Sequence, residues 1–256
     1  MRHWTKKLFA IAAPLLLTSC LWGPGKFASD LTLKKDGSFT LDYRGELVLQ
    51  VPDDQDTQPW TNAKAKCTDG DKAHACTAAE IDEQKNAYEK KRKDSEQMAK
   101  MFGLPGLDDA SNRAFAAKLS KYAGWRSVTY RGKGVFDVDY HFEGRATQDF
   151  LFPALPDNNM IIPFIAIRRR ADGAVLVTAP AFTGGAGPMG PAAAGAGDMA
   201  KAGPMSRAEG RFTVITDGEI LTNNSEDGAA PSPIGRQVHW DVGPASSKIP
   251  ETLIRL

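Results

Sequence analysis

The sequence predicts an α+β fold, a mainly antiparallel, twisted sheet of about nine strands that carries an insertion of two helices. Three observations lead to this prediction. Apolar and polar residues alternate in several short stretches, which is typical of strands with one buried face. Five Asp-Gly pairs are spread along the chain, and Asp-Gly favours tight hairpin turns. One long, highly charged segment begins with a helix-capping motif.

The predicted strands fall into two groups, one on each side of the charged segment. In the first group, a set of apolar residues falls at odd-numbered positions, with a hairpin turn expected at Asp36-Gly37. The set is Leu31, Leu33, Phe39, Leu41, Tyr43, Leu47, Leu49 and Val51. In the second group, a hairpin around residues 132–134 joins strands expected at 125–130 and 135–143. Further strands are predicted at 160–167, 174–178, 210–216, 219–222 and 236–242. Because the two groups are expected to share one sheet, residues 31–256 are predicted to form a single domain.

The helical insertion is predicted at residues 77–124. Thr77 and Glu80 form a capping box, and acidic residues precede basic ones along the segment, as the helix dipole favours. A second helix is expected from about Asp109 to Tyr122. Farther along, residues 183–206 are rich in Gly, Ala, Pro and Met without periodicity, which predicts a flexible loop.

The N-terminal twenty residues have the layout of a secretory signal. Three basic residues, Arg2, Lys6 and Lys7, precede the uncharged span 8–17. That span is about half the roughly 20 residues that a membrane-crossing helix needs. It ends in Leu17-Thr18-Ser19-Cys20, which resembles the lipobox of bacterial lipoproteins, where a cysteine is acylated and the chain is cut just before it.

This resemblance implies a membrane-anchored envelope lipoprotein. Residues 1–19 would be the signal peptide, and the mature chain would begin at Cys20 with a diacylglycerol thioether and an amide-linked acyl chain such as palmitate. Two or more acyl chains anchor a protein stably. Residues 20–30 are expected to form a lipidated tether. Leu21, in place of the Asp that commonly retains lipoproteins at the inner membrane, is similar to the signal for the outer membrane, so a periplasm-facing location is expected.

Two further cysteines, Cys67 and Cys76, are expected to form a disulfide, because the envelope permits oxidation. The alternative is a zinc site in which His74 is a third ligand. No second ligand cluster is present to complete such a site, and the disulfide is favoured. We therefore expect no metal or other cofactor.

The strongest catalytic candidate is the row Asp137, Asp139 and His141, with His239 as an optional fourth member. Alternate residues of a strand point the same way, so the row would suit metal-dependent or acid–base hydrolysis. The same pattern is expected of the solvated face of an antiparallel sheet, which is the favoured interpretation. No nucleophile elbow, zinc-protease motif, phosphate-binding loop or dinucleotide fingerprint is present. We therefore expect no enzymatic activity.

Three other groups were considered as sites. The triplet Arg168, Arg169 and Arg170 is a possible ligand-binding group for phosphate or an acidic glycan. The basic run 90–93 could contact anionic lipid, although neighbouring acidic residues cancel its charge. The methionines of the 183–206 tract are too widely spaced to indicate a copper site.

The net charge argues against nucleic acid as a partner. Removal of residues 1–19 takes three of the 32 basic side chains and none of the 31 acidic ones, which leaves a net charge of about −2. Nucleic-acid-binding domains are markedly basic.

Near the C-terminus, residues 218–224 and Val238-His239-Trp240 resemble a turn and a tryptophan-containing strand of mycobacterial LppM-type lipoproteins. The resemblance implies an envelope-facing domain without enzymatic activity. We expect a binding or scaffolding module for an envelope protein, lipid or glycan. The alternatives are a lipid carrier with an apolar cavity, or a hydrolase that uses the Asp137, Asp139 and His141 row.

Overall fold

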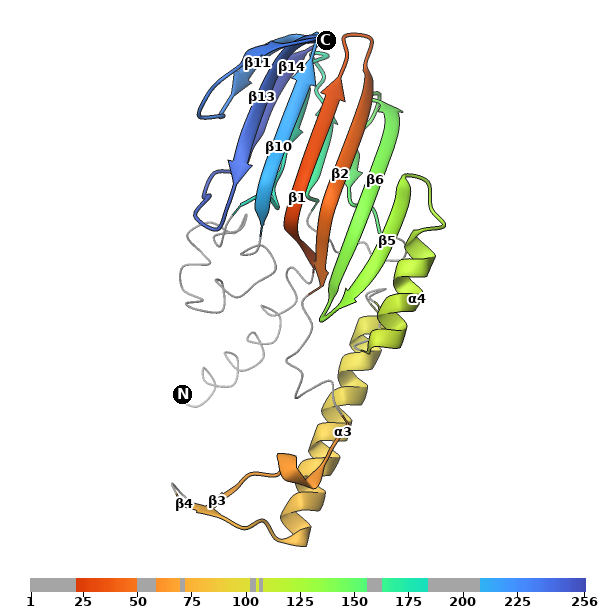
Figure 1. Ribbon diagram of the computed structural model, residues 1–256, viewed down its shortest axis with the longest axis vertical. Helices are drawn as coiled ribbons and strands as arrows, with labels where there is room; N and C mark the ends of the chain where they lie inside the picture. Colours follow the sequence, from red (N-terminus) through yellow and green to blue (C-terminus); the bar gives the residue numbers. More distant parts are fainter. Residues whose placement is uncertain are drawn as a thin grey trace, which may run out of the picture.

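The computed structural model describes residues 22–49, 59–69, 72–101, 105, 108–155, 163–183 and 208–256. The fold is α+β and mostly sheet, as predicted. The prediction of one sheet of about nine strands was wrong, because the strands lie in a seven-stranded sheet, a five-stranded sheet and a two-stranded ribbon (Figure 1). Alternation identifies which segments are strands, but it carries no information about which strands pair.

The seven-stranded sheet has the order β12-β13-β10-β1-β2-β6-β5. Its strands are β1 (Trp22–Leu33), β2 (Ser38–Leu49), β5 (Trp125–Gly132), β6 (Val135–Arg145), β10 (Glu209–Thr216), β12 (Ala230–Ser232) and β13 (Gly235–Val242). β1 and β10 are parallel, and the other neighbours are antiparallel. The parallel pair joins the two ends of the chain in the centre of the sheet.

β1 corrects the predicted tether at residues 20–30. The strand begins at Trp22 and pairs with β2 from its first residue. Pro24 is tolerated because β10 reaches β1 only at Lys26, so the missing N–H of Pro24 faces no second neighbour. The β1–β2 register shifts just after Pro24, and a Cβ at Gly25 would overlap the side chain of Glu46. Close packing therefore favours glycine at position 25, within a sequence that is otherwise typical of linkers.

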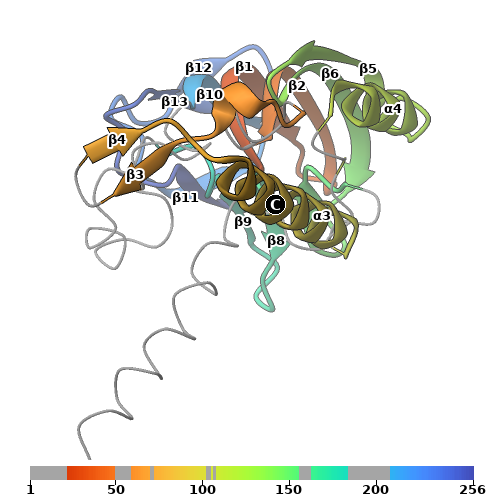
Figure 2. The ribbon, with the colours of Figure 1, turned by 90° about the horizontal axis from the view of Figure 1, so that it is seen from below.

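The five-stranded sheet has the order β11-β14-β9-β8-β7 and is antiparallel throughout. Its strands are β7 (Phe150–Phe152), β8 (Ile165–Arg169), β9 (Val175–Thr178), β11 (Glu219–Asn223) and β14 (Glu251–Arg255). The two sheets form the two layers of a sandwich, which Figure 2 shows from below.

Aromatic side chains fill the described interior between the sheets. Tyr43 of β2 contacts Phe152 and Phe164, with ring centroids 5.0 and 6.0 Å apart. Phe182 lies against both Phe27 and Phe212, at 4.1 and 5.5 Å. All belong to one buried cluster that draws on both sheets. This burial raises the pKa of the Tyr43 hydroxyl well above its ordinary value, and Glu46 contributes to the same shift.

The helix α4 (Asp109–Leu119) packs beside β5 and closes one end of this interior. Phe115 and Leu119 are buried, and the Phe115 ring stacks on Trp22 with centroids 5.5 Å apart. Asp108 caps the helix by accepting a hydrogen bond from the backbone N–H of Ser111. The Ser111 hydroxyl donates a second hydrogen bond to Asp108 and has the larger effect on its pKa. Together the two bonds hold the pKa of the Asp108 carboxyl below its ordinary value.

The first helix of the insertion forms a long projection. The helix α3 (Ala78–Met101) has 24 residues, or about 36 Å at 1.5 Å per residue, and extends away from the sandwich (Figure 1). Its far end carries η2 (Asn62–Lys64) and the ribbon of β3 (Cys67–Asp69) and β4 (Lys72–His74). We call residues 59–101 the arm. Its apolar stripe is too thin to bury a face, which explains why it projects.

Several expectations lie outside the described residues. They include the signal peptide, the acylated cysteine at position 20 and residues 184–206 of the predicted loop. Among the helices that the structure describes, none is both long and apolar enough to cross a membrane.

Candidate functional site

Asp137, Asp139 and His141 share the outer face of β6, as the alternation predicted, and each is engaged by a neighbour. Arg131 donates a hydrogen bond to Asp137, and Arg44 forms an ion pair with Asp139 at 3.5 Å. His141 lies between two carboxylates, with Nδ1 2.8 Å from Asp42 and Nε2 3.3 Å from Glu143. The row is therefore a ladder of cross-strand charge pairs.

The predicted row is divided among separate partners. Asp137 and Asp139 are each paired with an arginine, whereas His141 lies within hydrogen-bond reach of Asp42 on β2. His239, the suggested fourth member, lies on β13, four strand spacings from β6, or about 19 Å. No group of three His, Cys, Asp or Glu side chains in the described part of the chain is arranged to hold a metal ion.

The arginine triplet is divided among separate partners. Arg168 pairs with Asp149 at 3.7 Å, and Arg170 pairs with Asp172 at 3.1 Å. Arg169 donates instead to the backbone carbonyl of Ala146, at 3.3 Å. Two of the three positive charges are thus already balanced by carboxylates.

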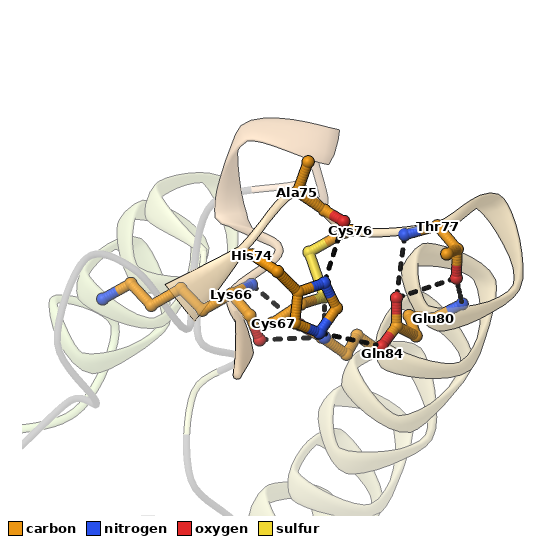
Figure 3. A network of polar contacts seen from close by, with 8 residues as sticks. All are labelled: Lys66, Cys67, His74, Ala75, Cys76, Thr77, Glu80 and Gln84. Carbon is orange, nitrogen blue, oxygen red and sulfur yellow. Dashed lines mark hydrogen bonds and ion pairs between the residues drawn. A yellow bond between two sulfur atoms is a disulfide. The ribbon is translucent and has the colours of Figure 1, made fainter. Parts of the chain in front are cut away.

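At the tip of the arm, Cys67 and Cys76 form the predicted disulfide (Figure 3). Sulfurs that are bonded to each other cannot serve as thiolate ligands, so the zinc alternative is wrong. His74 instead lies 3.5 Å from Glu80. The capping box is present as predicted: the Thr77 backbone N–H and hydroxyl donate to Glu80 and hold the pKa of its carboxyl below the ordinary value.

An open pocket of about 660 Å³ beside β13 was not predicted from the sequence. The pocket lies along residues 239–242 of β13, beyond the stretch of that strand that pairs with β12. Its other walls come from the start of β10 and from loops at residues 224–227 and 243–250. The lining is mixed, with the indole of Trp240 and two prolines on one hand and carboxylates, hydroxyls and one lysine on the other.

Asn224 organises the wall of this pocket. Its side-chain oxygen accepts hydrogen bonds from the indole N–H of Trp240 and from the backbone N–H of Glu251, both at 2.9 Å. Its amide nitrogen donates to the carbonyl of Ile249 at 2.7 Å. The Trp240 ring also stacks on Phe212, with centroids 5.6 Å apart and an interplanar angle of 21°. Asn224 thus ties β13 to β14 and fixes the indole at its N–H, while Phe212 holds the ring.

The pocket carries an excess of negative charge. His239 pairs with Asp227 at 3.2 Å. Arg211 donates to Asp241 at 2.7 Å, and this hydrogen bond lowers the pKa of the aspartate below its ordinary value. Glu209 and Glu226 also line the pocket, and within the described chain neither has an ion-pair or hydrogen-bond partner.

Only a weak signal of this site is visible in the sequence. The resemblance rests on residues 218–224 and on Val238-His239-Trp240, and the structure joins these two segments through the Asn224–Trp240 hydrogen bond. Comparison with known proteins found no matching family model, no matching curated protein and no matching solved structure. The resemblance to LppM-type lipoproteins therefore stays a prediction.

Proposed function

We propose that this chain is a lipoprotein of the bacterial envelope, anchored at Cys20, whose sandwich is a non-catalytic binding module. The partner would be another envelope component, either a protein, a lipid or a glycan. The expected location is the outer membrane, facing the periplasm. The observation that carries the proposal is the pocket beside β13, with its fixed indole and two carboxylates, Glu209 and Glu226, that have no partner in the described part of the chain.

Two observations favour this function over the alternatives. The polar row on β6 is occupied by charge pairs, which supports a solvated face over a hydrolase. The interior described between the sheets is filled with aromatic rings in contact, whereas a lipid carrier needs an apolar cavity of several hundred Å³.

Affinity purification of the full-length protein from detergent-solubilised envelope tests the proposal. We expect it to recover a reproducible protein, lipid or glycan. The matched control is the double variant Asp139→Asn/His141→Asn, which should recover the same component because its changes lie on the β6 face. Repeated purification without any enriched component would contradict a binding function. Loss of a cellular phenotype in the control variant, with folding intact, would favour the hydrolase.

Attachment is tested separately. Cys20→Ala should either release a folded protein from membranes or leave an uncleaved precursor. Membrane retention of a cleaved Cys20→Ala chain would contradict anchoring through this cysteine.

A further inference from the structure

The strand β13 leaves part of one edge of the seven-stranded sheet unpaired. β12 pairs only with residues 235–237 of β13, and the pocket of about 660 Å³ opens along the stretch that follows. We call residues 240–242 of β13 the open edge. An unpaired strand edge offers backbone N–H and C=O groups to another extended chain, so the open edge is a candidate site for strand addition.

The pairing of β12 with β13 determines which backbone groups point away from the sheet. Pro231 cannot exchange both hydrogen bonds with its partner Arg236, because proline has no N–H. The bonded pair is therefore the neighbouring one, Ala230 with Gln237, since bonded and non-bonded pairs alternate in an antiparallel ladder. The N–H and C=O of Gln237 thus face β12, and those of every second residue along β13 face the same side.

Asp241 is the residue of the open edge whose backbone points outward. His239, two residues before it, shows the same direction, because its carbonyl accepts a hydrogen bond from the Ser225 hydroxyl at 2.8 Å. The N–H and C=O of Asp241 follow on this side, and no group in the described part of the chain hydrogen-bonds to them. An antiparallel strand added here would exchange two backbone hydrogen bonds with Asp241.

Acidic side chains lie along the outer face beside the open edge. Asp241 and His239 point to this face, and His239 is paired with Asp227 at 3.2 Å. Glu209 points to it as well, by the alternation of β10. Continuing the β10–β13 register by one residue brings Gly243 opposite Glu209, and a Cβ at Gly243 would meet nothing within 4 Å. A long side chain of an added strand therefore has room to reach Glu209 across this glycine.

The balance of charge around the open edge favours a basic strand. Four carboxylates line the pocket against one lysine and one histidine. Two of the four, Glu209 and Glu226, have no ion-pair or hydrogen-bond partner within the described residues. Such carboxylates attract lysine or arginine side chains on an incoming strand and repel acidic ones.

The inner side of the open edge is apolar. Val242 points inward and lines the pocket together with Phe182, Pro244 and Pro250. Successive side chains of a strand point to opposite faces, so the residue between two outward-facing ones would lie on this side. The two faces together favour a strand in which basic and apolar residues alternate.

We propose that the open edge binds an extended segment of a partner protein with the pattern basic–apolar–basic. One basic residue lies opposite Asp241 and exchanges backbone hydrogen bonds with it. The apolar residue lies beside Val242, and the second basic residue reaches Glu209. This inference rests on the proposed binding function and assigns to it a class of partner.

The test is a fluorescence-polarisation titration of the full-length protein with a capped, labelled peptide, Thr-Lys-Val-Lys-Thr. We expect saturable binding that added salt weakens. The charge-reversed peptide Thr-Glu-Val-Glu-Thr should bind at least about tenfold more weakly. Methylation of both lysine backbone nitrogens keeps the charges but removes the N–H donors, and it should weaken binding by about fivefold or more.

Variants of the protein test the same site from the other side. Glu209→Gln/Glu226→Gln should weaken peptide binding by about threefold or more, since each exposed pair contributes modestly, and should leave the melting temperature unchanged. The matched control is Glu143→Gln, which removes an exposed carboxylate on β6 and should not alter binding.

Four results would overturn the proposal: no binding of the basic peptide, equal affinity for the charge-reversed peptide, unchanged affinity after methylation, or unchanged affinity of the double variant. A change in the oligomeric state of the free protein in the double variant would also overturn it, because the occupant would then be a second copy of this chain. A component still recovered by affinity purification after any of these results would refute the class of partner and leave the binding function intact.

Discussion

Reduction of the disulfide is expected to loosen the tip of the arm and leave the sandwich unchanged. The bond closes a loop of ten residues, since Cys67 and Cys76 are nine positions apart. The chain-entropy relation assigns such a loop about 2.7 kcal/mol. That free energy corresponds to about a 100-fold increase in local opening. The effect should stay local, because none of the residues described in the arm after Cys67 belongs to the buried core of the sandwich.

Hydrogen exchange followed by mass spectrometry can measure this opening. Reductant should speed exchange in β3, β4 and the first turn of α3, while β1 and β2 keep their protection. Reductant should have no effect on a Cys67→Ser/Cys76→Ser variant, which serves as the control. If exchange in β1 and β2 rose by the same factor, the arm and the sandwich would unfold together and the assignment of the arm as a separate unit would fail.

Three other predictions concern the stability of the sandwich. Asp108→Ala removes the N-terminal cap of α4 and should lower the free energy of unfolding, measured by denaturant titration, by about 1 kcal/mol. Hydrogen bonds from Ser111 lower the pKa of Asp108, so the contribution of this carboxylate to the free energy of unfolding should be present above the ordinary aspartate pKa of about 3.9 and be lost as the pH falls below that value. The free energies of unfolding of the wild type and the variant should therefore converge in acid. Burial raises the pKa of Tyr140 to about 12. The contribution of Tyr140 to the free energy of unfolding should therefore be intact below about pH 10 and fall by about 1.4 kcal/mol per pH unit between about pH 10 and 12. Tyr140→Phe should lessen this loss of stability at high pH. Gly210→Ala should destabilise the protein by about 1–3 kcal/mol, because the new Cβ would overlap the carbonyl oxygen of Phe27; an unchanged melting temperature would contradict the close approach of β10 to β1.

Local features were predictable from the sequence where their causes are local. Alternation in β2 and β6, the Thr77 capping box and the disulfide all depend on residues close together in the chain. The division into two sheets was not predictable, because it depends on the parallel pairing of β1 with β10 from opposite ends of the chain. Pattern alone could not reveal that pairing.

Composition was misleading at the start of β1. Glycine and proline at residues 23–25 are typical of a linker, yet the strand needs small residues there because Glu46 packs closely against Gly25. The pocket was missed for a related reason. Its carboxylates at Glu209, Glu226 and Asp241 are separated in the sequence and meet only when loop 224–227 folds beside β13.

The early start of β1 determines how the protein would stand on a bilayer. With Cys20 acylated as proposed, two Cα–Cα steps of 3.8 Å, about 8 Å in total, separate the anchored residue from Trp22 in the sandwich. So short a link keeps the end of the sheet where β1 begins close to the bilayer, and the arm extends from that same end (Figure 1). Glu209 pairs with Lys26, four residues farther along β1, or about 13 Å at 3.3 Å per residue. The pocket would therefore lie at the membrane-proximal end of the sandwich.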